Sequence, residues 1–186
     1  MAVTLLLVRH GQTEENLAQV LQGQLPGHLT ETGRKQAESI ALQLRHEHID
    51  VFMTSDLKRA VDTSHIINKT LHMDIILEPL LRERDFGKYT GMPYGTIIAP
   101  DDKDVEDVDR LYSRAGTWLE KITSRYDNQV VLAVSHGLFL RFIQAVCLNK
   151  TVRDIPRMEN AEVRRITLQH EIHHISRQEE IGSVES

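Results

Sequence analysis

Two histidines, His10 and His136, each follow an apolar run and precede a glycine. The runs 3–8 and 130–134 show no alternation of polar and apolar residues, which is typical of strands buried on both faces of a parallel sheet. If these strands lie side by side, their carboxyl ends bring the two imidazoles together, at the edge where open α/β sheets bind ligands. The sequence therefore predicts a site that contains both histidines.

Phosphoryl transfer is a chemistry that such a site can perform. A neutral imidazole is a nucleophile that can carry a phosphoryl group, and a glycine beside it lets the backbone approach an anion. The transition state also needs fixed cations, for which arginine is best suited. Arg9 adjoins His10, and Arg59 lies where a strand passes into a helix. From its position alone, Arg59 is equally well explained as an exposed helix residue.

A leaving alcohol must be protonated and a water molecule later activated, and both steps call for a carboxyl group. Glu83 lies in the glycine-containing stretch 80–91, and Asp85 lies two residues further on. Composition does not decide between these two residues.

Alternating helices and strands must position these side chains. Apolar residues at helical spacing, such as Ala37, Ile40 and Leu44, predict helices with one buried face. Ser55 or Asp56 is expected to cap the helix that follows. The expected strands lie at 3–8, 50–55, 73–77, 130–134 and 162–168, with 172–175 as a further candidate, and the expected helices at 37–44, 57–67, 105–122 and 137–146.

This alternation predicts an α/β fold, a three-layer α/β/α sandwich around a mostly parallel central sheet. We expect a single domain over 1–175 and a polar tail at 176–186. The acidic stretch 101–109 suits the N-terminus of the helix expected at 105–122, because the helix dipole favours negative charge there.

Bulk properties narrow the function classes. A formal net charge of −5 over 186 residues argues against a nucleic-acid partner, so any anion site must be a local cluster of basic residues. No apolar run approaches the length of a transmembrane helix, and a cytoplasmic protein without a membrane partner is expected. Cys147 lies among apolar residues and is expected to be a buried, unreactive thiol. The sequence leaves self-association open.

A metal site is an alternative interpretation of His170, His173 and His174. On one strand, His173 points away from the face that the other two share. The three side chains therefore cannot easily converge on one ion, and we expect neither a metal nor another cofactor.

Several of these segments together resemble the histidine phosphatase superfamily, in its phosphoglycerate mutase-like branch. The match begins with the Arg-His-Gly signature in 7–16 and continues in order through 29–37, 55–60, 81–91 and 134–137. The resemblance implies a phosphoglycerate mutase-like sandwich and a phosphoryl-transfer reaction that needs no metal.

The resemblance also implies residue roles. His10 is the expected nucleophile, which becomes phosphohistidine, and Glu83 rather than Asp85 is the expected proton donor. The residues that the resemblance assigns to the phosphate pocket or to substrate contacts are Arg9, Arg59, His136, Asn16, Gln22, Gly23 and Gly137.

Departures from the family pattern favour hydrolysis. Mutases of the family usually have a tyrosine where Phe86 stands and a long insertion that covers the substrate, whereas the stretch 91–135 is short. A mutase must keep water away from its phosphohistidine, so the resemblance implies a phosphatase with a shortened lid that acts on a small phosphorylated metabolite. The alternatives are a phosphoglycerate mutase and a non-catalytic phosphate-binding module. Segments 21–28 and 92–108 are expected to set the substrate, with 92–94 either at the entrance or packed as a plain loop.

Overall fold

The computed structural model describes residues 2–99 and 101–169 of the chain. Its centre is a sheet with the strand order β3-β2-β4-β1-β5. The first four strands in the chain are parallel to one another, and β5 runs antiparallel to β1. The strands are β1 (Ala2–Arg9), β2 (Val51–Thr54), β3 (Ile75–Leu77), β4 (Val130–Ser135) and β5 (Val163–Gln169).

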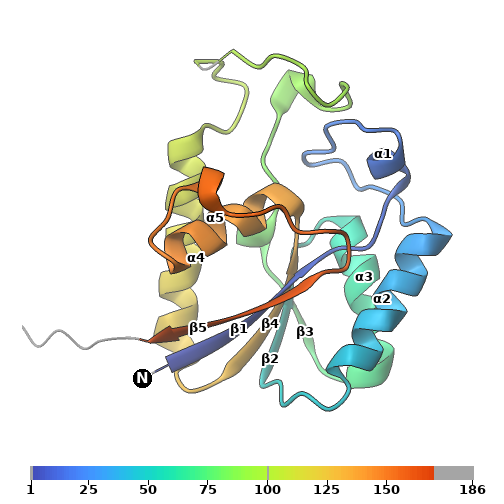
Figure 1. The fold of residues 1–186 in the computed structure, drawn as a ribbon, viewed down its shortest axis with the longest axis vertical. Helices are drawn as coiled ribbons and strands as arrows, with labels where there is room; N and C mark the ends of the chain where they lie inside the picture. The colour runs from blue at the N-terminus through green and yellow to red at the C-terminus, as the bar shows by residue number, and fades with distance from the viewer. Residues whose placement is uncertain (1, 100, 170–186) are drawn as a thin grey trace, which may run out of the picture.

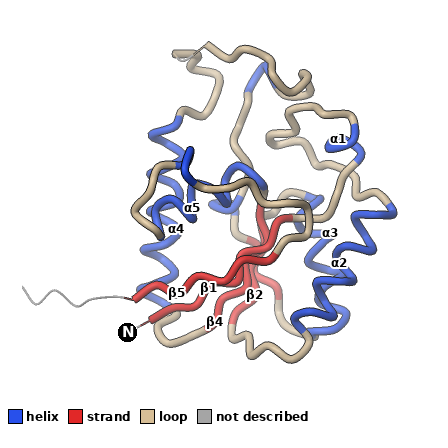
Figure 2. The backbone as a smooth tube through the Cα atoms, viewed as in Figure 1, coloured by secondary structure: helices blue, strands red, loops and turns tan. Residues whose placement is uncertain are grey.

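Helices cover both faces of this sheet, which confirms the predicted sandwich (Figure 1). One face carries α2 (Glu31–Leu44) and α3 (Lys58–Leu71), and the other carries α4 (Val108–Arg125) and α5 (Gly137–Cys147). Long loops separate the shorter elements (Figure 2). These are α1 (Glu14–Leu17) and the 3₁₀ turns η1 (Pro79–Leu81), η2 (Gly87–Tyr89) and η3 (Val152–Asp154).

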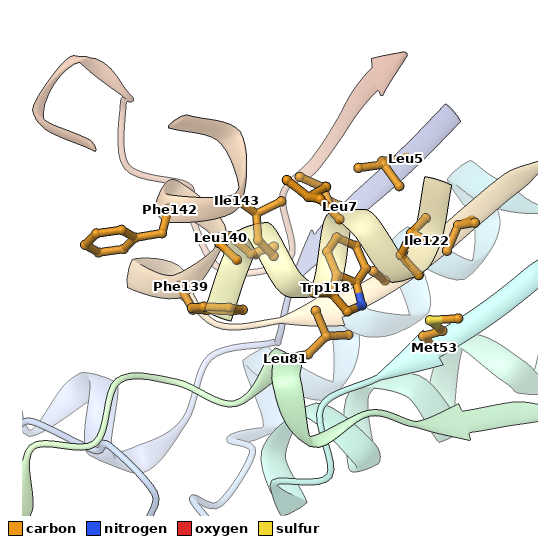
Figure 3. Packing of buried hydrophobic residues seen from close by; sticks show 14 of the residues in the cluster. Leu5, Leu7, Met53, Leu81, Trp118, Ile122, Phe139, Leu140, Phe142 and Ile143 are labelled. Carbon is orange, nitrogen blue, oxygen red and sulfur yellow. The ribbon is translucent and has the colours of Figure 1, made fainter. Parts of the chain in front are cut away.

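Both faces of β1 are buried, which explains its continuous apolar run. Leu5 and Leu7 belong to the core cluster under α4 and α5, whereas Leu6 and Val8 belong to the cluster under α2 and α3. Trp118 of α4 is fully buried at the centre of the first cluster (Figure 3). Burial of these side chains provides the main driving force that holds the strand ends in place.

The pairing of β1 with β4 fixes the position of the two His-Gly turns. Arg9 lies opposite Ser135 in the parallel register, and the backbone N–H of His10 donates to the carbonyl of Ser135 at 3.1 Å. His10 and His136 therefore leave neighbouring strands at the same edge of the sheet, as the sequence predicts.

The expected start of α4 and the expected N-cap of α3 are wrong, and α2 begins at Glu31 rather than at 37. Helix α4 begins at Val108, where the side chain of Asp107 accepts the backbone N–H of Arg110 at 2.8 Å. Most of the acidic stretch 101–109 therefore precedes the helix, and Val105 is buried from a loop rather than from a helix face.

The N-cap of α3 is Leu57, and no side chain caps this helix. Asp56 instead pairs with Arg82, and Ser55 contacts His136. The candidate strand 172–175, the tail 176–186 and the histidines at 170, 173 and 174 lie outside the described residues. None of the described helices is both long enough and apolar enough to cross a membrane.

Candidate active site

His10 is buried directly after β1, with 2% of its surface exposed. Its Nδ1 lies 2.7 Å from the carbonyl oxygen of Gly11, so the proton of a neutral ring sits on Nδ1 and the lone pair on Nε2. Burial, followed by the charges of Arg59 and Arg9, lowers the pKa of His10 well below its usual value, against the opposing effect of the Gly11 carbonyl. The ring is therefore neutral near pH 7, with Nε2 ready to act as a nucleophile.

Arg59 lies in the first turn of α3 and points inward, with 1% of its surface exposed. Its Nη2 donates to the carbonyl of Gly23 at 2.9 Å, Nη1 donates to the carbonyl of Leu25, and Nε donates to His10 Nε2 at 3.3 Å. Burial lowers the pKa of Arg59 to about 10, although the charge of Glu83 opposes this shift. Arg59 is a buried cation beside His10 and not an exposed helix residue.

The imidazole of His136 lies against that of His10, with 5.2 Å between the ring centroids. Its Nε2 is 2.8 Å from the hydroxyl of Ser55. A hydroxyl that donates to Nε2 leaves the ring proton on Nδ1. Burial is the main cause that lowers the pKa of His136 well below its usual value, followed by the charge of Arg59. His136 is therefore also neutral.

Two buried nitrogen atoms in this cluster have no hydrogen-bond partner among the described residues, Nδ1 of His136 and Nε of Arg9. The Nη1 of Arg9 donates to the carbonyl of Met158 at 2.6 Å. A buried donor without a partner costs free energy, and such donors gather where a ligand supplies the acceptor. A phosphate oxygen is a suitable acceptor for both nitrogen atoms.

Glu83 reaches the same place from the loop after η1. Its two carboxylate oxygens accept the backbone N–H groups of Leu138 and Phe139, each at 3.1 Å, in the first turn of α5. Asp85 is exposed and does not line the cavity that Glu83 lines. The structure thus brings Glu83, and not Asp85, together with His10.

A cavity of about 510 Å³ opens above these residues. Eight of the nine site residues expected from the sequence line it, and the ninth, His136, lies fully buried beneath. The eight are Arg9, His10, Asn16, Gln22, Gly23, Arg59, Glu83 and Gly137.

Residues 5–180 match the family model described as "Histidine phosphatase superfamily (branch 1)". The chain belongs to this superfamily. It is 38% identical over 135 residues to the uncharacterized phosphatase PhoE of Bacillus subtilis, and the match covers 70% of each chain. It is 33% identical over 186 residues to the probable phosphoglycerate mutase GpmB of Photorhabdus laumondii, covering 88% of this chain and 84% of that one. The solved structure of Bacillus stearothermophilus YhfR superposes with a TM-score of 0.80 and 26% identity, over 88% of this chain and 90% of that one.

Local hydrogen bonds hold several of the cavity-lining residues in place. Thr13 and Asn16 form a reciprocal cap at the start of α1, and the Thr13 hydroxyl donates to Gln22 Oε1 at 3.1 Å. A Cβ atom on Gly137 would lie 3.0 Å from Arg9 Nε. Glycine at position 137 therefore lets the Arg9 guanidinium pack against the start of α5.

The loop 92–94 is joined to the segment before α2 by backbone hydrogen bonds. The backbone N–H of Tyr94 donates to the Gln19 carbonyl at 2.7 Å, and that of Leu21 donates to the Met92 carbonyl at 2.8 Å. Tyr94 lines the cavity, whereas Met92 and Pro93 do not. Within 92–94, therefore, only Tyr94 reaches the entrance.

The sequence does not predict that residues 157–160 form one wall of the cavity. Asn160 lines the cavity and its side-chain amide donates to the His10 carbonyl at 3.1 Å and to Asn16 Oδ1 at 3.2 Å. No local pattern marks this segment, which reaches the site only because β5 returns antiparallel to β1. Among residues 2–99 and 101–169, no three histidine, cysteine or acidic side chains are grouped as metal ligands.

Proposed function

We propose that the chain is a phosphatase that hydrolyses phosphomonoesters through a phosphohistidine on His10, without a metal ion. The observation that carries this proposal is the buried, neutral His10, whose Nε2 faces the Arg59 guanidinium in the same cavity as the Glu83 carboxyl group. The cavity volume of about 510 Å³ suits a small phosphorylated metabolite. A cytoplasmic location and a small-molecule partner, rather than a nucleic acid or a membrane, belong to the same proposal.

The first step transfers the phosphoryl group to the enzyme. The Nε2 lone pair of His10 attacks phosphorus in line, the N–P bond forms, and the bond from phosphorus to the leaving oxygen breaks. Protonated Glu83 gives its proton to that oxygen. Arg59 Nε–H turns from His10 to a phosphate oxygen, and Arg9 donates to another. These fixed donors stabilise the charge on the equatorial oxygens.

The second step returns the enzyme to its starting state. The Glu83 carboxylate takes a proton from water as the water oxygen attacks phosphorus, and the P–N bond breaks. Inorganic phosphate leaves, His10 is neutral again and Glu83 is protonated for the next cycle. Nδ1–H of His136 stays within the phosphate pocket in both steps, so His136 acts as a donor and is not itself phosphorylated.

Trapping the intermediate tests the assignment of His10. A ³²P-labelled phosphomonoester is mixed with the enzyme and quenched in alkali, in which phosphohistidine is stable, and the labelled peptide is identified. We expect label on His10 and a loss of kcat of about a thousandfold or more in His10→Ala. His65→Ala, which removes an exposed histidine from α3, is the matched control. Near-normal turnover by His10→Ala refutes the proposal.

Leaving-group dependence tests Glu83. We expect Glu83→Gln to lower kcat/KM by about a hundredfold for an alkyl phosphate and far less for p-nitrophenyl phosphate, whose leaving group needs no proton. Asp85→Asn is the control, because Asp85 does not line the cavity. Equal losses on both esters would remove Glu83 as the acid of the first step.

Product analysis separates hydrolysis from mutase activity. Because the cavity is open to solvent at Tyr94, which is half-exposed, we expect water to reach phosphohistidine. With 3-phosphoglycerate, a phosphatase releases inorganic phosphate, whereas a mutase forms 2-phosphoglycerate and responds to bisphosphoglycerate. A non-catalytic module binds phosphate but yields neither product nor label.

A further inference from the structure

One wall of the cavity is held rigidly by arginine side chains. The segment 155–158 follows η3 and leads toward β5 (Figure 1). Each of its four consecutive backbone carbonyls accepts a hydrogen bond from a guanidinium group. The bonds are Arg141 to Ile155 at 2.9 Å, Arg164 to Pro156 at 3.1 Å and to Arg157 at 2.9 Å, and Arg9 to Met158 at 2.6 Å.

The core fixes the same segment from its other side. Ile155 and Met158 are buried, with 3% and 1% of their surfaces exposed. Arg157 lies between them, is exposed, and lines the cavity. Neighbouring carbonyls and side chains hold the backbone that carries Arg157, so only the side chain of Arg157 has to be ordered when a ligand binds.

The positive charge of Arg157 is not neutralised by an ion pair within the described residues. Among the described residues, the Arg157 guanidinium has no ion-pair or hydrogen-bond partner, although its backbone carbonyl accepts from Arg164. Arg141 also lines the cavity, but its Nε and Nη2 are used on the carbonyls of Ile155 and Val152. Burial and the charge of Arg157 both lower the pKa of Arg141, which places the two cations near one another.

The phosphate of a substrate does not account for these two cations. Arg9, Arg59 and His136 lie around His10 and serve the reacting phosphate in the proposed mechanism. At the wall, two arginines face one carboxylate, the exposed Glu159. The remaining single positive charge matches a monoanionic carboxylate better than a dianionic second phosphate.

We propose that Arg157, supported by the charge of Arg141, binds a carboxylate on the part of the substrate that leaves, so that the preferred substrates are phosphorylated carboxylic acids. This inference rests on the proposed phosphatase function and adds a specificity-determining residue to it. The planar guanidinium fork can bind both carboxylate oxygens, and Arg157 does not take part in the phosphoryl chemistry.

A matched pair of substrates tests this subsite. 3-Phosphoglycerate and glycerol 3-phosphate have the same three-carbon skeleton and differ in whether the remote carbon is a carboxylate or an alcohol. We expect wild type to prefer the acid in kcat/KM by about tenfold, in line with one charge-assisted contact at a partly solvated site. Arg157→Gln should remove most of this preference while leaving the alcohol within about twofold, and Arg157→Glu should reverse it.

Arg153→Gln is the control, because Arg153 is an exposed arginine of η3 that does not line the cavity. It removes the same net charge and should retain the preference for the acid. Added salt should weaken the preference in wild type, since an exposed cation is screened. No preference in wild type, or an equal loss on both substrates in Arg157→Gln, overturns the subsite.

Failure of the subsite and failure of the phosphatase are separable. Turnover of p-nitrophenyl phosphate with label on His10 supports the phosphatase regardless of Arg157. If no ester is turned over, calorimetric binding of the same two compounds to wild type, Arg157→Gln and Arg153→Gln still decides the subsite. Tighter binding of the acid that is lost only in Arg157→Gln supports it, and equal binding refutes it.

Discussion

Two buried neutral histidines should make the folded state lose stability as the pH falls below 6.5. Burial is the main cause that holds the pKa values of His10 and His136 well below 6.5, and the neighbouring arginines add to it. In the unfolded chain both rings take up a proton near that pH. The unfolded state therefore binds more protons, and the free energy of unfolding rises with pH in this window.

The magnitude follows from the ordinary histidine pKa of 6.5. For a ring that stays neutral in the folded state at pH 5.5, the lost stability is RT ln(1 + 10), about 1.4 kcal/mol. At pH 7.5 the same expression gives about 0.1 kcal/mol. Two such rings therefore contribute a loss of about 2.6 kcal/mol between these pH values, a large share of a typical domain stability of about 5–15 kcal/mol.

Urea unfolding of wild type and His136→Asn at pH 7.5 and 5.5 measures the contribution of the His136 ring to the pH dependence of stability. Asparagine is suitable because residue 136 is the N-cap of α5, a position that asparagine favours. Other titrating groups act on both proteins and cancel in the difference. We expect the stability of the variant relative to wild type to improve by about 1.3 kcal/mol on acidification. A difference that does not change with pH would show that the pKa of His136 is the same in the folded and unfolded states, and would refute the lowered pKa of the buried ring. A change in the opposite direction would show that folded His136 is protonated.

Three further changes test the supporting geometry. Ser55→Ala removes the hydroxyl that contacts Nε2 of His136, and it should lower kcat about tenfold with little change in KM. The ¹⁵N shifts of His136 should show that the ring proton leaves Nδ1. An unchanged tautomer would contradict the role of the Ser55 hydroxyl. Gly27→Ala places a Cβ 2.8 Å from Arg59 Cδ at a backbone φ of +71°, which should displace the Arg59 side chain. The displacement should weaken inhibition by inorganic phosphate about tenfold. Normal inhibition would show that Arg59 has not moved. Cys147 is half-buried rather than buried as the sequence predicts, but desolvation raises its pKa to about 12. A thiol reagent should therefore modify the native chain slowly because little thiolate is present, and rapid native labelling at neutral pH would contradict this.

The burial of β1 on both faces, which makes it a central strand beside β4, could be predicted because the signal lies in consecutive residues. Leu5 and Leu6 point to opposite faces and both are buried, so the absence of alternation in the sequence reports a strand that is covered on both sides. The His-Gly turn that follows is then placed by topology alone. The position of Glu83 needed the family resemblance, because Asp85 offers the same chemistry two residues later.

The role of Arg59 could be predicted from the family resemblance but not from its position in the sequence, because that role depends on a different part of the chain. The hydrophobic periodicity of a helix does not determine whether a polar side chain in its first turn faces solvent or the site. The carbonyls of Gly23 and Leu25 decide the outcome, and they lie in an irregular loop without a pattern. The wall that contains Arg157 was missed for the same reason, since the return of β5 to β1 is a long-range pairing.

The partners of Arg59 explain how a chain with a net charge of −5 keeps a binding site for an anion. A carboxylate that paired with this buried guanidinium would neutralise it, and an incoming phosphate would have to break that ion pair. Carbonyl oxygens satisfy the N–H groups of Arg59 without cancelling its charge, as the Met158 carbonyl does for Arg9. Together with burial, which is the main cause, the same uncancelled charge lowers the pKa of His10 and keeps the ring unprotonated. Replacing a carbonyl partner by a carboxylate would therefore weaken phosphate binding and, by raising the pKa of His10, also reduce the fraction of nucleophile at neutral pH.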